Sequence, residues 1–221
     1  MNRKISFAVG EFYHIYNRGN DKKIIFRDEK DRIRFTHLLF LCNNIQPVVY
    51  KTILSRDIFN SPRKQLLVDI GAYCLMPNHF HILIYERAQN GISIFMKKIS
   101  TAYSMYFNLK NKRTGKLFEG VFKAQHVNDD QYLRYLYAYI HLNPIKLVEP
   151  KWEGQHIKNI NQAKAFLKKF SHSSFLDYTG YARKAGSILS KNAFPEYFSE
   201  KHSFTDFVDD LINSKVFPKN I

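Results

Sequence analysis

The spacing of apolar residues along the chain predicts an alternation of strands and helices. Apolar and polar residues alternate over residues 7–17, which is typical of a strand. Apolar residues then recur at helical spacing after Asp28, an aspartate that can cap the first turn of a helix. Two apolar runs follow, over 67–75 and 79–85, and the turn-forming residues between them predict a hairpin.

Two more helices and one more strand are expected after this hairpin. Residues 92–106 carry apolar residues at helical spacing and predict a long second helix. A fourth strand is expected over 117–127. A third helix is expected to begin after Asn128 as its cap and to end just before Pro144, because the residue before a proline disfavours the helical conformation.

The predicted order is therefore strand, helix, strand, strand, helix, strand and then a further helix. The first six elements match the ferredoxin-like (split βαβ) pattern, an α+β fold in which an antiparallel sheet carries two helices on one face. The other face is left for the following helix or for a ligand. We expect residues 1–150 to form this domain and residues 151–221 to form a C-terminal helical extension, in which Ser203 caps a short amphipathic helix.

Charge narrows the kinds of partner that the protein can have. The 221 residues include 34 lysines and arginines against 19 aspartates and glutamates, which gives a formal net charge of +15. This balance disfavours an acidic, cation-seeking protein and favours a polyanionic partner. The hydrophobic share of 45% and the charged share of 24% are those of a globular chain rather than a disordered one.

The basic residues are densest in a stretch that also contains aromatic residues. Between Lys97 and Lys123 the only acidic residue is Glu119. Basic side chains attract phosphates and aromatic rings stack on unpaired bases, although a solvated helix face with its aromatic residues in the core gives the same pattern. The candidate nucleic-acid contacts are Arg18, Lys97, Lys98, Lys112, Arg113, Lys116 and Lys123.

Cysteine content and hydropathy exclude further classes of protein. The sequence has only two cysteines, Cys42 and Cys74, so neither a disulfide scaffold nor a four-cysteine zinc site can form. The longest apolar runs, such as 80–85, are far shorter than the roughly 20 residues of a membrane span. The N-terminus has no apolar segment of signal-peptide length. We therefore expect a cytoplasmic, nucleoid-associated protein with no membrane partner.

A pair of histidines is the first candidate for chemistry. His79 and His81 lie two residues apart on a predicted strand, so their side chains share one face of the sheet while Phe80 faces the core. Two imidazoles in this arrangement can bind one metal ion. Taken alone, two histidines on a strand are more often polar surface residues than ligands.

The end of the third predicted helix presents a phenol and an amide together. Asn143 lies four residues after Tyr139 and therefore on the same face of the helix. A tyrosine hydroxyl is a weak nucleophile near its ordinary pKa, but it can form covalent intermediates once it is activated or aligned. We interpret Tyr132 and Tyr135 as part of a stripe that packs on the sheet.

Several separated motifs together resemble one family. The segments Tyr73-Cys74-Leu75-Met76-Pro77-Asn78-His79-Phe80-His81 and Tyr139-Ile140-His141-Leu142-Asn143-Pro144 are similar to motifs of the single-tyrosine HUH transposases. More narrowly, they resemble the REP-associated tyrosine transposase (RAYT) branch, which is associated with repetitive extragenic palindromes. Flanking segments agree with this resemblance at 13–20, 106–108 and 115–120.

The resemblance implies a metal-dependent enzyme that cleaves single-stranded DNA and transfers strands. It makes Tyr139 the nucleophile, which forms a 5′-phosphotyrosine and frees a 3′-hydroxyl. It makes His79, His81 and Asn143 the ligands of one divalent metal, Mg or Mn, with asparagine where the wider family has glutamine. Single-stranded or hairpin DNA is the implied partner, residues 1–150 are the implied HUH catalytic domain, and both monomers and homodimers occur among relatives.

Two residues complicate this assignment. Val121 stands where relatives often have an arginine, which removes one expected phosphate contact and leaves Lys123 as a candidate substitute. His14 shares a strand face with Phe12 and Tyr16, so it becomes a rival to Asn143 as a metal ligand if the first strand adjoins the histidine pair.

Two other functions fit parts of the pattern. The basic surface with its aromatic residues is also expected of a non-catalytic module that holds structured nucleic acid without cutting it. A metal-dependent phosphodiesterase in which water attacks the phosphate would use the two histidines but would not need Tyr139.

Overall fold

A four-stranded antiparallel sheet organises the molecule. The computed structural model describes residues 6–47, 50, 55–152, 157–197 and 201–213. The strands lie in the order β2-β3-β1-β4, and every neighbouring pair is antiparallel. Their bounds are Phe12–Arg18 for β1, Val68–Met76 for β2, His79–Glu86 for β3 and Lys123–Val127 for β4. This is the strand order of the ferredoxin-like fold, so the expected α+β class is confirmed.

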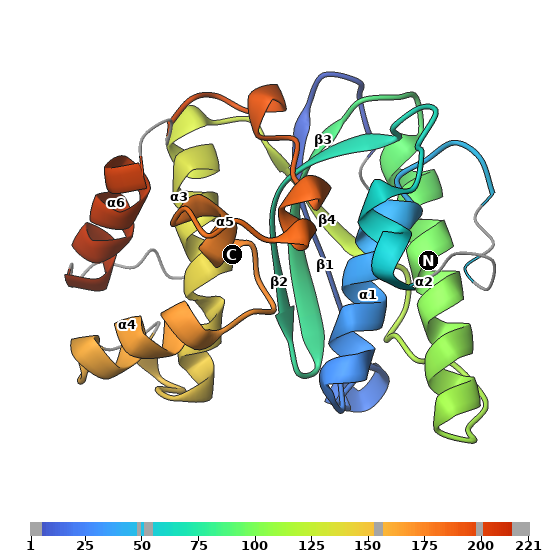
Figure 1. Cartoon of the computed structure of the whole chain (residues 1–221), viewed down its shortest axis with the longest axis horizontal. Coiled ribbons are helices and arrows are strands. Elements are labelled where there is room, and N and C mark those ends of the chain that lie inside the picture. Colours follow the sequence, from blue (N-terminus) through green and yellow to red (C-terminus); the bar gives the residue numbers. More distant parts are fainter. Residues whose placement is uncertain (1–5, 48–49, 51–54, 153–156, 198–200, 214–221) are drawn as a thin grey trace.

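Helices cover both faces of the sheet. Helices α1 (Glu29–Leu41) and α2 (Gly91–Lys110) lie on one face, and α3 (Asp130–Leu142) lies on the other (Figure 1). Helix α3 therefore covers the face of the sheet for which the sequence predicted either a helix or a ligand. Three further α-helices described by the structure are α4 (Ile160–Lys169), α5 (Phe175–Tyr178) and α6 (Lys201–Asn213). Short 3-10 helices, labelled η, are η1 (Asn20–Lys22), η3 (Ser55–Asn60), η4 (Asn143–Leu147), η6 (Lys184–Ile188) and η7 (Lys191–Ala193).

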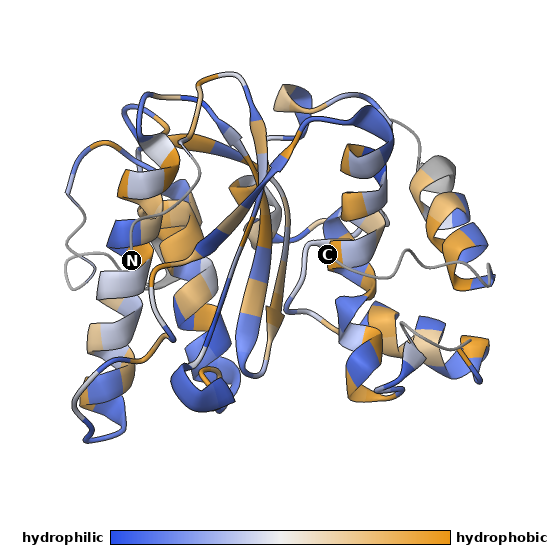
Figure 2. Cartoon of the chain, turned by 180° about the vertical axis from the view of Figure 1, so that it is seen from behind, coloured by the Kyte–Doolittle hydropathy of each residue, from blue (hydrophilic) through white to orange (hydrophobic). Residues whose placement is uncertain are grey.

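Alternation along the strands creates two hydrophobic cores. On β3, Phe80 and Ile82 belong to the core under α1 and α2, whereas Leu83 belongs to the core under α3. The C-terminal helices α4 and α6 extend this second core on the side of α3 away from the sheet (Figure 1). Figure 2 shows the resulting hydrophobic stretches on the central strands and on the packed helices. Because β3 faces both cores, the histidines at its start are held on a rigid element.

Two strand boundaries differ from the sequence-based expectation. Strand β1 begins at Phe12 rather than at residue 7, although Phe7 still packs edge-on against Tyr13 with 4.9 Å between ring centroids. Strand β4 begins at Lys123 rather than at residue 117. The apolar residues before it, among them Leu117 and Phe118, are buried in the core but lie in a loop. Their apolar character therefore led to a predicted strand that is too long.

Two helix caps also differ from the expectation. The cap of α3 is Asp129 rather than Asn128, and its carboxylate accepts a hydrogen bond of 2.6 Å from the backbone N–H of Tyr132. Helix α6 begins at Lys201, so Ser203 lies inside the helix instead of capping it. The cap of α1 is confirmed, because the Asp28 carboxylate accepts from the N–H of Asp31.

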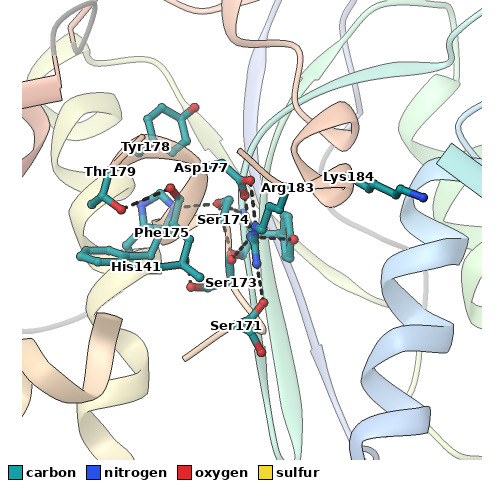
Figure 3. A network of polar contacts seen from close by, with 12 residues as sticks. His141, Ser171, Ser173, Ser174, Phe175, Asp177, Tyr178, Thr179, Arg183 and Lys184 are labelled. Atoms are coloured by element: carbon teal, nitrogen blue, oxygen red, sulfur yellow. Dashed lines mark hydrogen bonds and ion pairs between the residues drawn. The ribbon is translucent and has the colours of Figure 1, made fainter. Parts of the chain in front are cut away.

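The C-terminal extension is fixed to the outer edge of the sheet. The N–H of Leu75 on β2 donates to the carbonyl of His172 at 2.9 Å, and the N–H of Ser174 donates to the carbonyl of Tyr73 at 3.0 Å. Arg183 holds the same segment in place, with hydrogen bonds to Asp177 and to backbone carbonyls of the serine-rich loop (Figure 3). The extension therefore completes the sheet edge instead of forming a separate body.

Candidate active site

The central strands bring three histidines to one face of the sheet. Strand β1 pairs with β3 so that Tyr16 lies opposite His81 and Arg18 lies opposite His79. His14, two residues before Tyr16, points to the same face because strand side chains alternate. This is also the face that α3 covers, so the helix meets the histidines directly.

Tyr139 of α3 lies against this cluster. Its ring meets that of His81 edge-on with 5.6 Å between centroids and that of His14 with 6.0 Å. The rings of His79 and His81 are 5.0 Å apart and perpendicular. The tyrosine and the two histidines singled out from the sequence are therefore neighbours, although 58 residues separate His81 from Tyr139.

The ring of His79 is neutral, and one of its nitrogens forms a hydrogen bond. Its Nδ1 lies 2.6 Å from the amide oxygen of Asn78. The pKa of His79 is lowered to about 4, chiefly by burial and then by the nearby charge of Lys146, while the side chain of Asn143 acts in the opposite direction. At neutral pH the ring carries no charge, and the bond at Nδ1 leaves Nε2 with its lone pair, which is the form that binds metal ions.

His81 is more deeply buried and is paired with His14. Its Nδ1 lies 2.9 Å from Nε2 of His14, and the two rings are stacked with centroids 5.1 Å apart. Burial above all, and then the neighbouring His14 and His79, hold the pKa of His81 well below its usual value. The first strand thus does adjoin the histidine pair, but His14 contacts His81 itself.

Asn143 ends α3 in helical geometry despite the proline that follows. Its φ and ψ are −48° and −39°, because Pro144 stands in the first turn of η4, where a proline is tolerated. The Nδ2 group donates to the carbonyl of Tyr139 at 3.0 Å. The Oδ1 atom is buried without a hydrogen bond of normal geometry to any described residue, yet the amide is near enough to affect His79.

These contacts fit a small divalent-metal site built from two imidazoles and an amide oxygen. A buried oxygen without a partner is unfavourable unless a ligand satisfies it. Within the described ranges, no group of three or more histidine, cysteine, aspartate or glutamate side chains is arranged to hold a metal ion. A ligand set drawn from this site therefore depends on the amide of Asn143 in addition to His79 and His81.

Lys146 is a site residue that sequence reasoning missed. Its Nζ lies 5.7 Å from the centroid of the Tyr139 ring, and its charge contributes to the lowered pKa values of His79 and His81. Lys146 comes seven residues after Tyr139, two helical turns further on, so the spacing offered a signal. The proline between them concealed it, because a helix was expected to stop there.

The basic residues predicted to contact nucleic acid lie in separate parts of the structure. Arg18 lies at the end of β1 nearest the candidate site, where its guanidinium group forms a bidentate ion pair with the carboxylate of Glu119. Lys123 lies on β4 opposite Tyr16 and is exposed. Lys112, Arg113 and Lys116 follow α2, and Arg113 lies over the ring of Phe107.

Lys97 and Lys98 lie at the other end of the sheet. Helix α2 begins beside Glu86, whose carboxylate accepts from the N–H of Ile92, and β3 places Glu86 roughly 20 Å from His79. The ammonium group of Lys98 donates to the carbonyls of Asn44, Ile45 and Gln46. These contacts give Lys98 a structural role in closing the loop after α1.

Tyr132 packs against the second core, as its spacing suggested, whereas Tyr135 is half-buried beside Tyr139. The ring of Tyr135 lies 6.2 Å from that of Tyr139. Burial raises the pKa of Tyr132 to about 12, with smaller effects from Tyr139 and Tyr16. Tyr16 is a second phenol near the histidines, with 6.0 Å between the ring centroids of Tyr16 and His81, whereas the ring of Tyr139 lies 5.6 Å from that of His81.

Comparison with known proteins supports the fold. The structure of a REP-associated tyrosine transposase bound to a REP hairpin has a similar fold, with a TM-score of 0.50 and 13% sequence identity over 84% of this chain and 90% of that one. None of the curated proteins matches the sequence significantly. In the described parts of the chain, none of the helices combines the length and the apolar character that a membrane span requires.

The sequence matches one family of transposases. The family described as IS200-like transposases matches residues 31–143, about half of the chain, and this span includes His79, His81, Tyr139 and Asn143. The chain therefore belongs to the IS200-like transposase family, whose members are DNA-processing enzymes.

Proposed function

We propose that the protein cleaves and rejoins single-stranded DNA at hairpin or palindromic sites, with Tyr139 as the nucleophile. The observation that carries this proposal is the contact between the ring of Tyr139 and the ring of His81, with 5.6 Å between centroids. A tyrosine in a structural stripe has no need of two buried histidines, His14 and His81, and a half-buried third, His79, beneath it. A phenol beside potential metal ligands is the arrangement that a tyrosine endonuclease requires.

His79, His81 and Asn143 would hold one divalent ion, Mg or Mn, through imidazole nitrogens and an amide oxygen. When bound, such an ion polarises a non-bridging oxygen of the scissile phosphate and orients it. The two lowered histidine pKa values favour this role, because a neutral imidazole can donate its lone pair at physiological pH. Asn143 is positioned by its bond to the carbonyl of Tyr139, so ligand and nucleophile are coupled within one helical turn.

Tyr139 performs the covalent step. Its phenolic oxygen forms a bond to the scissile phosphorus, the bond from phosphorus to the 3′ oxygen breaks, the phenolic proton is released, and the departing oxygen takes up a proton. The products are a 5′-phosphotyrosine and a free 3′-hydroxyl. The covalent link keeps the energy of the broken bond, so the 3′-hydroxyl of another strand can reverse the step and join the strands.

The position of an exposed lysine on the sheet supports hairpin DNA as the substrate. Helix α3 contacts β2 and β3 most closely, while β4 at the opposite edge carries the exposed Lys123. The transposase of similar fold is bound to a REP hairpin. A formal charge of +15 supplies the attraction for phosphates. In this proposal residues 1–150 form the catalytic domain, residues 151–221 support it, and the protein works on the nucleoid in the cytoplasm.

A labelled hairpin oligonucleotide incubated with the protein and Mn²⁺ tests the proposal. We expect wild type to form a covalent protein–DNA adduct, Tyr139→Phe to form none, and the matched variant Tyr135→Phe to form it nearly as well. His79→Ala should abolish the adduct while hairpin affinity changes less than about threefold, because affinity comes from phosphate contacts elsewhere. Hairpin binding without an adduct from wild type would favour the non-catalytic binding module. Cleavage that persists in Tyr139→Phe would favour attack by water.

A further inference from the structure

His14 and His81 form a buried pair of imidazoles that share one hydrogen bond. Nε2 of His14 lies 2.9 Å from Nδ1 of His81, and the rings are stacked with an interplanar angle of 19°. Only 1% of the His14 surface and 7% of the His81 surface are exposed. In a hydrogen bond between two imidazole nitrogens, one nitrogen carries the proton and the other accepts it.

The two histidines of the proposed metal site differ in how their proton is placed. Nδ1 of His79 faces an amide oxygen, that of Asn78, which can only accept, so the proton of His79 lies on Nδ1. Nδ1 of His81 faces another imidazole, which can donate or accept. The position of the proton on His81 therefore depends on the role that His14 takes.

Each choice has a different consequence for Nε2 of His81. When His14 accepts, His81 carries its proton on Nδ1 and keeps a lone pair on Nε2. When His14 donates, His81 must carry its proton on Nε2, and that nitrogen cannot bind a metal ion. Imidazoles that ligate metals characteristically donate through their second nitrogen, which fixes the tautomer and the orientation of the ring.

We propose that His14 is a positioning residue that accepts a hydrogen bond from Nδ1 of His81 and thereby presents Nε2 of His81 as a metal ligand. This role rests on the metal site of the proposed function. It removes His14 as a rival ligand, because Nε2 of His14 accepts from His81 and Nδ1 of His14 then carries the proton. It also explains why a third histidine lies fully buried in the face of the sheet beside Tyr139.

The arrangement leaves a polar atom of His14 unsatisfied. When Nε2 accepts, the proton of His14 lies on Nδ1, and this atom is buried with no hydrogen-bond partner among the residues that the structure describes. A buried N–H without a partner destabilises the arrangement. The same atom would be an unsatisfied acceptor if His14 donated through Nε2, so a ligand on Nε2 of His81 is what selects the accepting role.

Metal binding to two His14 variants tests this role. His14→Phe keeps a flat ring against His81 but removes the acceptor, whereas His14→Gln retains an amide oxygen that can accept. Isothermal titration with Mn²⁺ should show binding 10- to 100-fold weaker in His14→Phe, the usual effect of losing such a partner, and a partial recovery in His14→Gln. His141→Phe, which removes another buried neutral imidazole bonded to Ser174 at 2.6 Å, is the matched control and should bind Mn²⁺ like wild type.

Nitrogen NMR of the wild-type protein tests the same role even if a variant fails to fold. Spectra recorded with Zn²⁺, which is diamagnetic and also binds imidazole, should show His81 protonated on Nδ1 and His14 protonated on Nδ1. Zinc bound through Nδ1 of His81, or through His14, would overturn the proposal.

The outcomes separate this inference from the function on which it rests. A wild-type protein that binds neither ion, or that binds equally well in His81→Ala, contradicts the metal site and the role of His14 together. A wild type whose Mn²⁺ binding requires His81 but is unchanged in His14→Phe contradicts the role of His14 alone.

Discussion

At the scale of single residues, a positive charge stands beside the proposed nucleophile. The ammonium group of Lys146 lies 5.7 Å from the centroid of the Tyr139 ring. Negative charge develops on the phenolic oxygen before it attacks, and the phosphate that it attacks is negative as well. A fixed positive charge at this place stabilises both, in an environment where burial strengthens electrostatic interactions.

Replacing Lys146 should therefore slow the chemical step. We expect Lys146→Gln to lower the single-turnover rate of adduct formation about 10- to 100-fold at saturating DNA, and Lys146→Arg to restore most of the rate. Quenched reactions with a labelled hairpin measure this rate. Lys168→Gln, which removes an exposed lysine of α4, provides the control and should leave the rate unchanged. A Lys146→Gln variant as fast as wild type would show that this charge has no part in the reaction.

The sequence predicted which residues become neighbours in the candidate site better than it predicted their individual contacts. Strand periodicity placed His79 and His81 on one face, and helical spacing placed Tyr139 beside Asn143. The pairing of Arg18 with Glu119 joins residues 101 positions apart, and no local pattern signals such a contact. The bond between His14 and His81 similarly depends on which strands become neighbours.

At the scale of elements, the loop before α5 is held to β2 by one buried ion pair. Arg183 donates to Asp177 at 2.8 Å and 2.5 Å and also reaches the hydroxyl of Tyr73 at 3.2 Å (Figure 3). Only 4% of the Asp177 side chain is exposed. Removing the arginine would leave this carboxylate buried without its main counter-charge.

Arg183→Gln should lower the free energy of unfolding by about 3 kcal/mol. Urea unfolding followed by circular dichroism measures this change, and faster hydrogen exchange at the N–H groups of Tyr73 and Leu75 should accompany it. Lys164→Gln breaks the half-exposed pair with Asp209 and should cost less than about 1 kcal/mol. Equal effects of the two substitutions would contradict a central role for Arg183.

Element boundaries were predictable where local chemistry is unambiguous. The two apolar runs on either side of Met76-Pro77-Asn78 gave β2 and β3 to within a residue or two, because the turn residues end both strands. The start of β4 was wrong, since an apolar loop and a strand have similar composition. The cap of α3 was wrong by one residue, because Asn128, Asp129 and Asp130 can all cap a helix and only packing selects among them.

At the scale of the whole molecule, buried neutral histidines make folding sensitive to acid. Burial lowers the pKa of His14 and of His141 to about 3, whereas a histidine in an unfolded chain titrates near 6.5. Between these values the unfolded chain binds more protons than the folded protein. The stability contributed by these rings is therefore complete above pH 6.5 and decreases as the pH falls toward 3.

Lowering the pH from 7 to 5 should reduce the free energy of unfolding by about 2 kcal/mol for each such ring. Urea unfolding at pH 7, 6 and 5, with EDTA present to remove metal ions, measures the effect. The His141→Gln variant should be less stable at pH 7 but should lose less stability on acidification than wild type. A urea midpoint that stays constant between pH 7 and pH 5 would refute the assignment of these rings as neutral in the folded state.

The cover over the edge strand β2 limits how far this transposase can be shortened. All nine residues of β2 are buried although the strand lies at an edge, because residues 172–174 and the helices after them cover it. A shortened protein that stopped at residue 150 would expose a long apolar edge with unpaired N–H and C=O groups, which is a template for joining other chains. We therefore expect a protein shortened in this way to self-associate through β2.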